Sequence, residues 1–258
     1  MKKVMTILGT RPEIIKLSPL LPLLDKHFQQ IIVHTGQHYS YELDKIFFEE
    51  IKLREVNYQL NVGSGTQAYQ TGMMMIGIEE AALKEKPDLI LVQGDTNTSL
   101  ASTLVAVKLG IPLAHIEAGY RSGNLHMPEE VNRIATDRFS RYLFVGIKEG
   151  MDNLHREGIA HSGIFLVGNT ALDALRRNEK HADNSTILRK LNLEERKYVF
   201  VTVHRAENTE EENLKNIVTG LNNIADKILL VLPLHPRTKA ALERFKIDRK
   251  STRLNSSH

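Results

Sequence analysis

Residues 3–16 read Lys-Val-Met-Thr-Ile-Leu-Gly-Thr-Arg-Pro-Glu-Ile-Ile-Lys, an apolar run that ends in a glycine turn and opens into a helical segment. Thr10 and Glu13 have the spacing of a capping box, and Pro12 lies in the first turn, where its missing N–H costs little. A helix N-terminus with free backbone N–H groups attracts anions. Because Arg11 lies in this turn and Lys16 in the next, the stretch predicts a site for a phosphate-bearing ligand.

Strand-like runs alternate with helical patterns along most of the chain. We predict strands at 3–8, 30–35, 89–93, 112–117, 142–145, 164–167, 198–203 and 228–232, with helices at 69–83, 98–109, 129–140 and 210–224. This alternation predicts a parallel sheet covered by helices on both faces, and the continuous apolar strands fit burial on both sides. Pro19 and Pro22 fall inside the first helical stretch, so we expect a break near Ser18.

A charged segment, 176–197, divides the chain into two parts. We place the domain boundary close to 168–173, which gives an N-terminal Rossmann-like domain at 1–168 and a partial second domain at 169–247. The second domain offers two strands, too few to bury the core of a Rossmann-like sheet, so we expect it to be incomplete.

The last residues, 248–258, have no apolar period and interrupt a helix that is still running. They resemble the translation of a sequencing adapter, and we predict a non-native tail on a truncated chain; a natural polar tail is the alternative. The chain has a net charge of +3, and this segment carries three positive charges and one negative. The remaining charge is too small to indicate nucleic-acid binding.

The composition excludes several classes of protein. The 258 residues contain no cysteine, which excludes disulfides and thiolate metal sites and fits a reducing compartment. Apolar runs stay well short of the roughly 18 residues of a membrane span, so we expect a cytoplasmic protein without membrane partners. The P-loop, dinucleotide-binding and zinc-protease motifs are absent, and we expect neither a cofactor nor a metal.

Polar side chains follow the predicted strands in both domains. Open parallel sheets bind ligands beyond the carboxyl ends of their strands, so these residues predict a cleft between the domains. The residues at the strand ends are Arg11, Gln37, His38, Asp95, His115, Glu117, His204 and His235.

Several of these residues also allow a structural interpretation. Arg11 and Lys16 could be solvated helix residues. Asp95 could be a helix N-cap, because Asp is favoured there. Glu117 ends an apolar strand, and a buried carboxylate needs a partner, for which Arg121 is a candidate.

Glu129 follows a proline at the start of another predicted helix, where the helix dipole keeps a carboxylate ionised. The alternative is ordinary acidic enrichment at a helix start. Arg133 lies four residues later on the same helix face, so a salt bridge between the two is expected. His115 fits a satisfied structural histidine. His204 also fits one, but His204 followed by Arg205 suits a pyrophosphate as well.

Taken together, these segments resemble the non-hydrolysing UDP-N-acetylglucosamine 2-epimerases of bacteria and archaea. The similar segments are GTRPEIIK at 9–16, TGQH at 35–38, GDTNT at 94–98, HIEAGYRS at 115–122, MPEEVNR at 127–133, VGNTALDAL at 167–175 and VTVHRAEN at 201–208. The resemblance implies an α/β fold of two Rossmann-like domains in a GT-B arrangement, the second incomplete here. It also implies a homodimer that binds a UDP-sugar between its domains without a cofactor.

In that family the reaction inverts C2 of UDP-N-acetylglucosamine to give UDP-N-acetylmannosamine, by eliminating UDP and adding it back. The resemblance implies catalytic roles for Asp95, Glu117, Glu129 and His204, and substrate binding by Arg11, Lys16, Gln37, His38, Arg133 and His235. A hydrolysing epimerase that releases N-acetylmannosamine and UDP is the alternative, and a diacetamido-uronate nucleotide is a close substrate variant. Complete members continue beyond 247 to form the uridine pocket, so we also weigh an inactive sugar-nucleotide-binding fragment.

Overall fold

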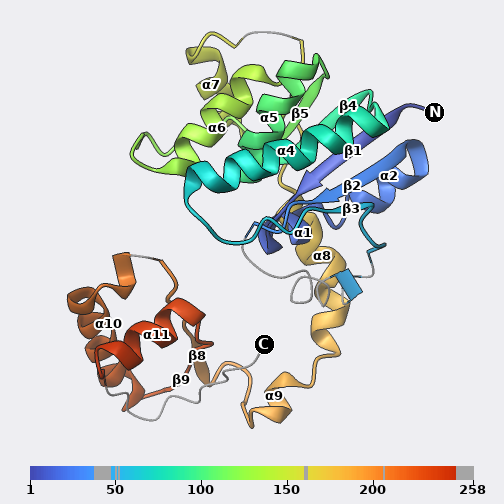
Figure 1. Cartoon of the computed structure of the whole chain (residues 1–258). Coiled ribbons are helices and arrows are strands. Elements are labelled where there is room, and N and C mark those ends of the chain that lie inside the picture. The colour runs from blue at the N-terminus through green and yellow to red at the C-terminus, as the bar shows by residue number, and fades with distance from the viewer. Residues whose placement is uncertain (38–47, 50, 52, 160–161, 206, 248–258) are drawn as a thin grey trace. The chain divides into compact units, whose positions relative to one another are not determined.

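The computed structural model divides the chain into two compact units, Met1–Glu179 and Lys180–His258 (Figure 1). It describes residues 1–37, 48–49, 51, 53–159, 162–205 and 207–247. The division falls inside helix α8 (Thr170–Asp183), later in the chain than the boundary predicted at 168/169, which stays a prediction.

A seven-stranded parallel sheet forms the centre of the first unit. Its strands are β1 (Lys3–Leu8), β2 (Gln29–His34), β3 (Tyr58–Gln59), β4 (Leu89–Gln93), β5 (Leu113–Ala118), β6 (Tyr142–Val145) and β7 (Ile164–Leu166). Their order across the sheet is β3-β2-β1-β4-β5-β6-β7. The chain therefore progresses outward from β1 in one direction and from β4 in the other. This reversal places a ligand-binding crevice beyond the carboxyl ends of β1 and β4.

Helices cover both faces of the sheet, because its central strands are apolar on both sides. They are α1 (Arg11–Leu17), α2 (Leu21–His27), α4 (Gln67–Glu85), α5 (Asn97–Leu109), α6 (Pro128–Phe139) and α7 (Lys148–Arg156). On one face, α4 and α5 pack against Met5 and Ile7, and Figure 1 shows these two helices side by side. On the other face, α1 and α2 pack against Val4 and Leu8. Each of these buried aliphatic side chains contributes roughly 1.5–3 kcal/mol to stability.

The break between α1 and α2 confirms the expectation from the two prolines. α1 ends at Leu17, the backbone N–H of Ser18 bonds to the Ile15 carbonyl at 3.2 Å, and α2 begins at Leu21. Pro22 lies in the first turn of α2, where no backbone donor is lost. The change of direction lets both short helices follow the sheet surface.

The second unit has a small core of its own. Its elements are α9 (Ile187–Lys190), β8 (Tyr198–Phe200), a 3-10 turn (Glu207–Thr209), α10 (Glu211–Ala225), β9 (Leu229–Val231) and α11 (Pro236–Arg244). β8 and β9 pair in parallel, and Leu214 of α10 and Leu242 of α11 pack with Val203 and Leu232. The α/β class with two Rossmann-like units is confirmed, the second unit contributing two strands among its described residues. Within the described ranges, no helix has the length and apolar character required to cross a bilayer.

We expect Gly9→Ala to lower the free energy of unfolding by about 1–3 kcal/mol, the usual cost of overpacking. A Cβ at Gly9 would lie 1.9 Å from Thr35 Oγ1 and 2.4 Å from Thr98 Oγ1. These two hydroxyls are hydrogen-bonded to each other at 2.8 Å and would have to separate. Denaturant unfolding followed by circular dichroism measures the change.

The matched control is Gly72→Ala in α4, where no atom lies within 4 Å of an added Cβ. Alanine favours helix over glycine by about 1 kcal/mol, so this variant should be more stable than the parent protein. A Gly9→Ala protein as stable as the parent would contradict the close packing at the end of β1.

Candidate active site

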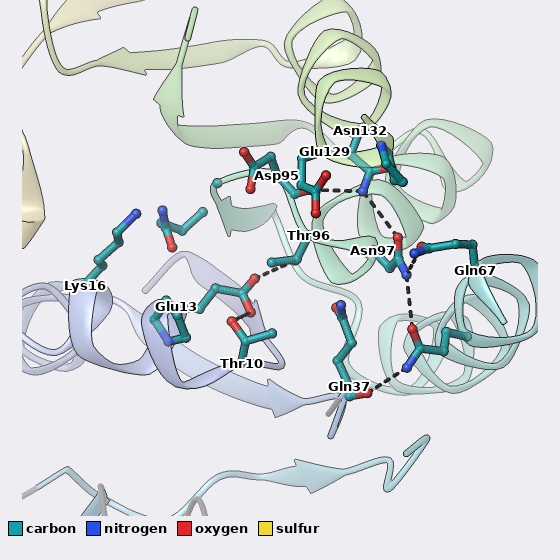
Figure 2. Close-up of a pocket in the computed structure, with 15 residues that line it drawn as sticks. Thr10, Glu13, Lys16, Gln37, Gln67, Asp95, Thr96, Asn97, Glu129 and Asn132 are labelled. Carbon is teal, nitrogen blue, oxygen red and sulfur yellow. Dashed lines mark hydrogen bonds between the residues drawn. The ribbon is translucent and has the colours of Figure 1, made fainter. Parts of the chain in front are cut away.

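A polar cavity of about 300 Å³ lies beyond the carboxyl ends of β1 and β4, at the reversal of the strand order. The loop after β1 contributes Thr10 and the loop after β4 contributes Asp95, while α6 brings Glu129 to the cavity (Figure 2). A second hollow of about 320 Å³ shares Lys16, Asp95 and Gly94 with the first. The second hollow is also lined by Glu117, Tyr120, Arg133 and Asn169.

Glu13, which the sequence does not distinguish as a site residue, is buried in the wall of the first cavity. Its carboxylate accepts hydrogen bonds from the Gly9 N–H (3.0 Å), the Thr10 hydroxyl (2.8 Å) and the Thr96 hydroxyl (2.8 Å). Burial raises the pKa of Glu13, and these donors oppose the rise. The carboxylate thus joins the loop after β1 to the loop after β4, as Figure 2 shows.

The predicted capping box at the start of α1 is wrong in one half. Thr10 is the N-cap residue, but its hydroxyl caps no helix N–H and donates to Glu13 instead. A buried carboxylate without donors is more costly than one unpaired N–H at a helix end. The helix end that the sequence offers to a phosphate is therefore partly occupied by a carboxylate of the protein itself.

Glu117 projects from the end of β5 and forms an ion pair with Lys16 of α1. Lys16 Nζ lies 2.7 Å from Glu117 Oε2, and the Gln93 amide donates to the same oxygen at 2.5 Å. The Glu117 side chain is only 12% exposed and that of Lys16 is 31% exposed, so the carboxylate is largely removed from water and the ammonium is not. The expected pairing of Glu117 with Arg121 is wrong.

Arg121 instead contacts Asp137 at 2.7 Å and Glu157 at 2.6 Å. The cause is the backbone between the two residues. Glu117 has a φ of +69° and Gly119 a φ of +81°, and both turns direct the following chain toward α6 and α7. A left-handed φ at a residue with a side chain costs on the order of 1–3 kcal/mol and is concentrated at functional sites. The register between β5 and β6 shifts at the same point.

Asp95 follows β4 and forms an ion pair with Arg133 of α6. Its interpretation as an N-cap is wrong, because Thr96 caps α5 by accepting from the Ser99 N–H at 3.3 Å. The side-chain amide of Asn132 donates to the Asp95 carbonyl at 2.9 Å and holds the loop from the other side.

Arg133 does not pair with Glu129, as the i,i+4 spacing suggested. It contacts Glu130 at 3.2 Å, and Glu130 in turn accepts from the backbone N–H groups of Ser122 and Gly123, each at 2.9 Å. Glu129 makes no ion pair or hydrogen bond with any residue that the structure describes. Its carboxylate lies above Thr96 and faces the cavity in Figure 2. The positive end of the helix dipole at this helix start attracts negative charge.

The remaining predicted residues lie in different places. Arg11 is half-buried at the first position of α1 and lines neither hollow. Gln37 is buried beside the cavity, and its side-chain oxygen accepts from the Thr98 hydroxyl at 3.1 Å. His38 lies outside the described residues.

His204 and His235 belong to the second unit. Their ring centroids are 6.1 Å apart, His204 is exposed, and His235 caps α11 by accepting from the Arg237 N–H at 3.2 Å. The residues that the first unit brings together are therefore Lys16, Gln37, Asp95, Glu117, Glu129 and Arg133.

Sequence reasoning missed Glu13, Gln93 and Glu130. Gln93 had a signal, since it is the polar last residue of an apolar strand, and Glu130 had none beyond its position beside Glu129. Among the residues that the structure describes, no cluster of His, Asp and Glu is suited to hold a metal ion.

Three comparisons place the chain among known proteins. A family model described as UDP-N-acetylglucosamine 2-epimerase matches residues 23–256. A UDP-N-acetylglucosamine 2-epimerase of Methanocaldococcus jannaschii is 50% identical over 253 residues, which cover 95% of this chain and 69% of that protein. A UDP-2,3-diacetamido-2,3-dideoxy-D-glucuronate 2-epimerase of Pseudomonas aeruginosa is 42% identical and covers 94% of this chain and 69% of that protein.

The structural comparison agrees with these matches. The crystal structure of the M. jannaschii enzyme in complex with UDP-GlcNAc and UDP has a TM-score of 0.86 at 50% identity. The similar region covers 95% of this chain and 69% of that one. Because the similarity includes both units of this chain, it confirms the GT-B class of fold. On its sequence, its fold and the geometry of its strand ends, this chain belongs to the UDP-N-acetylglucosamine 2-epimerase family.

Proposed function

We propose that this protein is a non-hydrolysing epimerase that inverts C2 of UDP-N-acetylglucosamine to give UDP-N-acetylmannosamine. The observation that carries the proposal is the gathering of Asp95, Glu117 and Glu129 with Lys16 at one crevice in a member of this family. The bound UDP-GlcNAc and UDP in the M. jannaschii structure support a UDP-sugar as the ligand. We further propose a cytoplasmic homodimer.

The chemistry explains why such a site needs both carboxylates and cations. No carbonyl adjoins C2 of the sugar, so its proton is too weakly acidic for simple removal. In the proposed elimination, a base takes this proton, the C–H electron pair becomes the C1=C2 bond, and UDP leaves with the electrons of the C1–O bond. Addition of UDP to C1 with protonation of C2 from the other face yields the epimer. Water must be excluded, because it would hydrolyse the intermediate.

The three carboxylates differ in their partners. Asp95 and Glu117 are each held by a cation, whereas Glu129 has no partner among the described residues. Proton transfer to and from C2 by this group is consistent with general acid–base catalysis. His204 would contact the UDP from the second unit, together with His235.

Cations next to the departing pyrophosphate offset the charge that develops on it. Lys16 suits this role, because its ammonium has three donors and Glu117 uses one of them. The ion pair with Glu117 thus holds Lys16 in place and leaves two N–H donors of its ammonium for the pyrophosphate. Arg11 would add a second cation from the same turn, and Arg133 a third from α6.

A second substrate is favoured by one observation. The P. aeruginosa relative named for a 2,3-diacetamido uronate is 42% identical to this chain, so the same C2 chemistry is compatible with a different sugar. The ratio of kcat/KM for the two nucleotide sugars separates the candidates.

We expect the protein to interconvert the two epimers in deuterated water with deuterium entering C2. NMR and mass spectrometry of the product measure the label. The chain spans about 69% of the length of its M. jannaschii relative. Epimer without deuterium would contradict the elimination, and free N-acetylmannosamine as the main product would assign a hydrolysing enzyme.

Replacing each carboxylate by its amide should lower kcat by about 10²–10⁴-fold, the usual contribution of a general acid or base. The variants are Asp95→Asn, Glu117→Gln and Glu129→Gln, and steady-state kinetics measure them. Glu80→Gln, on the exposed side of α4, is the matched control and should retain full activity. Full activity in all three site variants would refute the assignment.

Lys16→Met should lower kcat/KM by about 10²–10³-fold, because one preorganised cation on the leaving group is lost. It should also weaken inhibition by free UDP, whereas Glu117→Gln should leave UDP inhibition nearly unchanged. Lys26→Met on α2 controls for the loss of a surface charge. Unchanged UDP inhibition in Lys16→Met would show that Lys16 acts on Glu117 alone.

A further inference from the structure

His115, which takes no part in the proposed proton transfers, is fully buried between two acceptors. Its Nδ1 lies 2.7 Å from Asp137 Oδ1, and its Nε2 lies 2.8 Å from the Gly94 carbonyl oxygen. A neutral imidazole donates from one ring nitrogen and accepts at the other. A backbone carbonyl can only accept, so Nε2 carries a proton.

Whether Nδ1 also carries a proton depends on the ionisation of Asp137. Asp137 Oδ2 accepts from the Gly119 N–H at 3.0 Å and from Arg121 Nη1 at 2.7 Å. Two donors, one of them a guanidinium, thus already face Oδ2, which is the setting of a carboxylate and not of a carboxylic acid. An ionised carboxylate can only accept, and Nδ1 therefore carries a proton as well.

We propose that His115 is a buried imidazolium that positions the two loops carrying Asp95 and Glu117. Its Nε2–H holds the carbonyl of Gly94, the residue before Asp95, while its partner Asp137 holds the N–H of Gly119, two residues after Glu117. One cation–anion pair thus fastens the ends of β4 and β5 to α6. This positioning role rests on the proposed function, whereas the charge of the ring does not.

The surroundings balance this charge. Asp137 faces the ring from α6, Arg121 reaches the same carboxylate from the loop after β5, and Glu157 after α7 pairs with Arg121 at 2.6 Å. The four charges sum to zero, with Glu157 exposed to solvent, and this pairing offsets the cost of burying His115 and Asp137. Asp95 and Glu117 lie on the two loops themselves, where Arg133 and Lys16 pair with them.

The hold of His115 on the two loops depends on pH. Removing a ring proton at high pH abolishes a hydrogen bond to either Gly94 or Asp137, which releases one of the loops. Epimerase activity should then fall on the alkaline side. In Asp137→Asn the counter-charge of the imidazolium is gone, so the alkaline limb of kcat should move to lower pH by about one to three units.

The charge is tested first, by NMR of the protein labelled with ¹⁵N-histidine. Through-bond correlation to the backbone of β5 assigns the ring signals of His115. The expected result at neutral pH is a proton on both ring nitrogens. A ring with one unprotonated nitrogen would overturn the proposal, and this result depends neither on a variant that folds nor on epimerase activity.

The positioning role is tested by pH–rate profiles of the parent enzyme, His115→Gln and Asp137→Asn. Circular dichroism first establishes that each variant is folded. We expect kcat to fall by up to about 100-fold in His115→Gln, since a displacement of about 1 Å in a catalytic group costs that much. His155→Gln, on the exposed side of α7, is the matched control and should leave the profile unchanged.

The NMR spectra and the pH–rate profiles test the charge of His115, its positioning role and the proposed function separately. An imidazolium seen by NMR with an unshifted alkaline limb in Asp137→Asn would overturn the positioning role alone. Should His115→Gln fail to fold, the Asp137→Asn profile and the ring signals still decide the proposal. Absence of epimerase activity in the parent enzyme would refute the proposed function and leave the charge of His115 to the NMR result.

Discussion

Charged side chains held away from water must be paired, and this constraint organises the whole edge of the first unit. The pairs join elements that are remote in the sequence, so they also fix the loops that carry them. They are Lys16 with Glu117, Arg133 with Asp95 and Glu130, Arg121 with Asp137 and Glu157, and His115 with Asp137. Breaking a fully buried pair such as His115 with Asp137 by removing one partner typically costs about 3–5 kcal/mol, whereas pairs with the more exposed Asp95 and Glu157 contribute less. The ends of β1, β4 and β5 are therefore held in one arrangement.

Glu129 is the exception among these carboxylates, and the exception suits the proposed chemistry. A carboxylate that is already paired must give up part of an ion pair when it accepts a proton. Glu129 faces the cavity without a partner among the described residues, in the first turn of α6. Rigid, paired neighbours around one free carboxylate form a preorganised site of the kind that acid–base catalysis requires.

The sheet of the first unit could be predicted well from the sequence. The strands predicted at 3–8, 89–93 and 142–145 have the observed bounds, because apolar runs buried on both faces are a strong local signal. β3 was missed, since a strand of two residues at the sheet edge carries no pattern. In the second unit, β8 and β9 are shorter than the apolar runs that contain them.

The site could be predicted as a place and as a set of residue types. Polar residues after strands 3–8, 89–93 and 112–117 had to meet, because the carboxyl ends of parallel strands share one edge. Their partners could not be predicted in the same way. Both expected pairings are wrong: that of Glu117 with Arg121, which was based on the need of a buried carboxylate for a partner, and that of Glu129 with Arg133, which was based on spacing.

By itself, the sequence determined the α/β class, the edge where the site lies, and the family. Only the tertiary structure decided which charged side chains form ion pairs with one another. A backbone turn such as that at Glu117, which has a left-handed φ, changes the direction of the residues that follow. The number of residues between two side chains does not reveal such a turn. Ion pairs depend on distances of a few ångström in space, which only the folded chain sets.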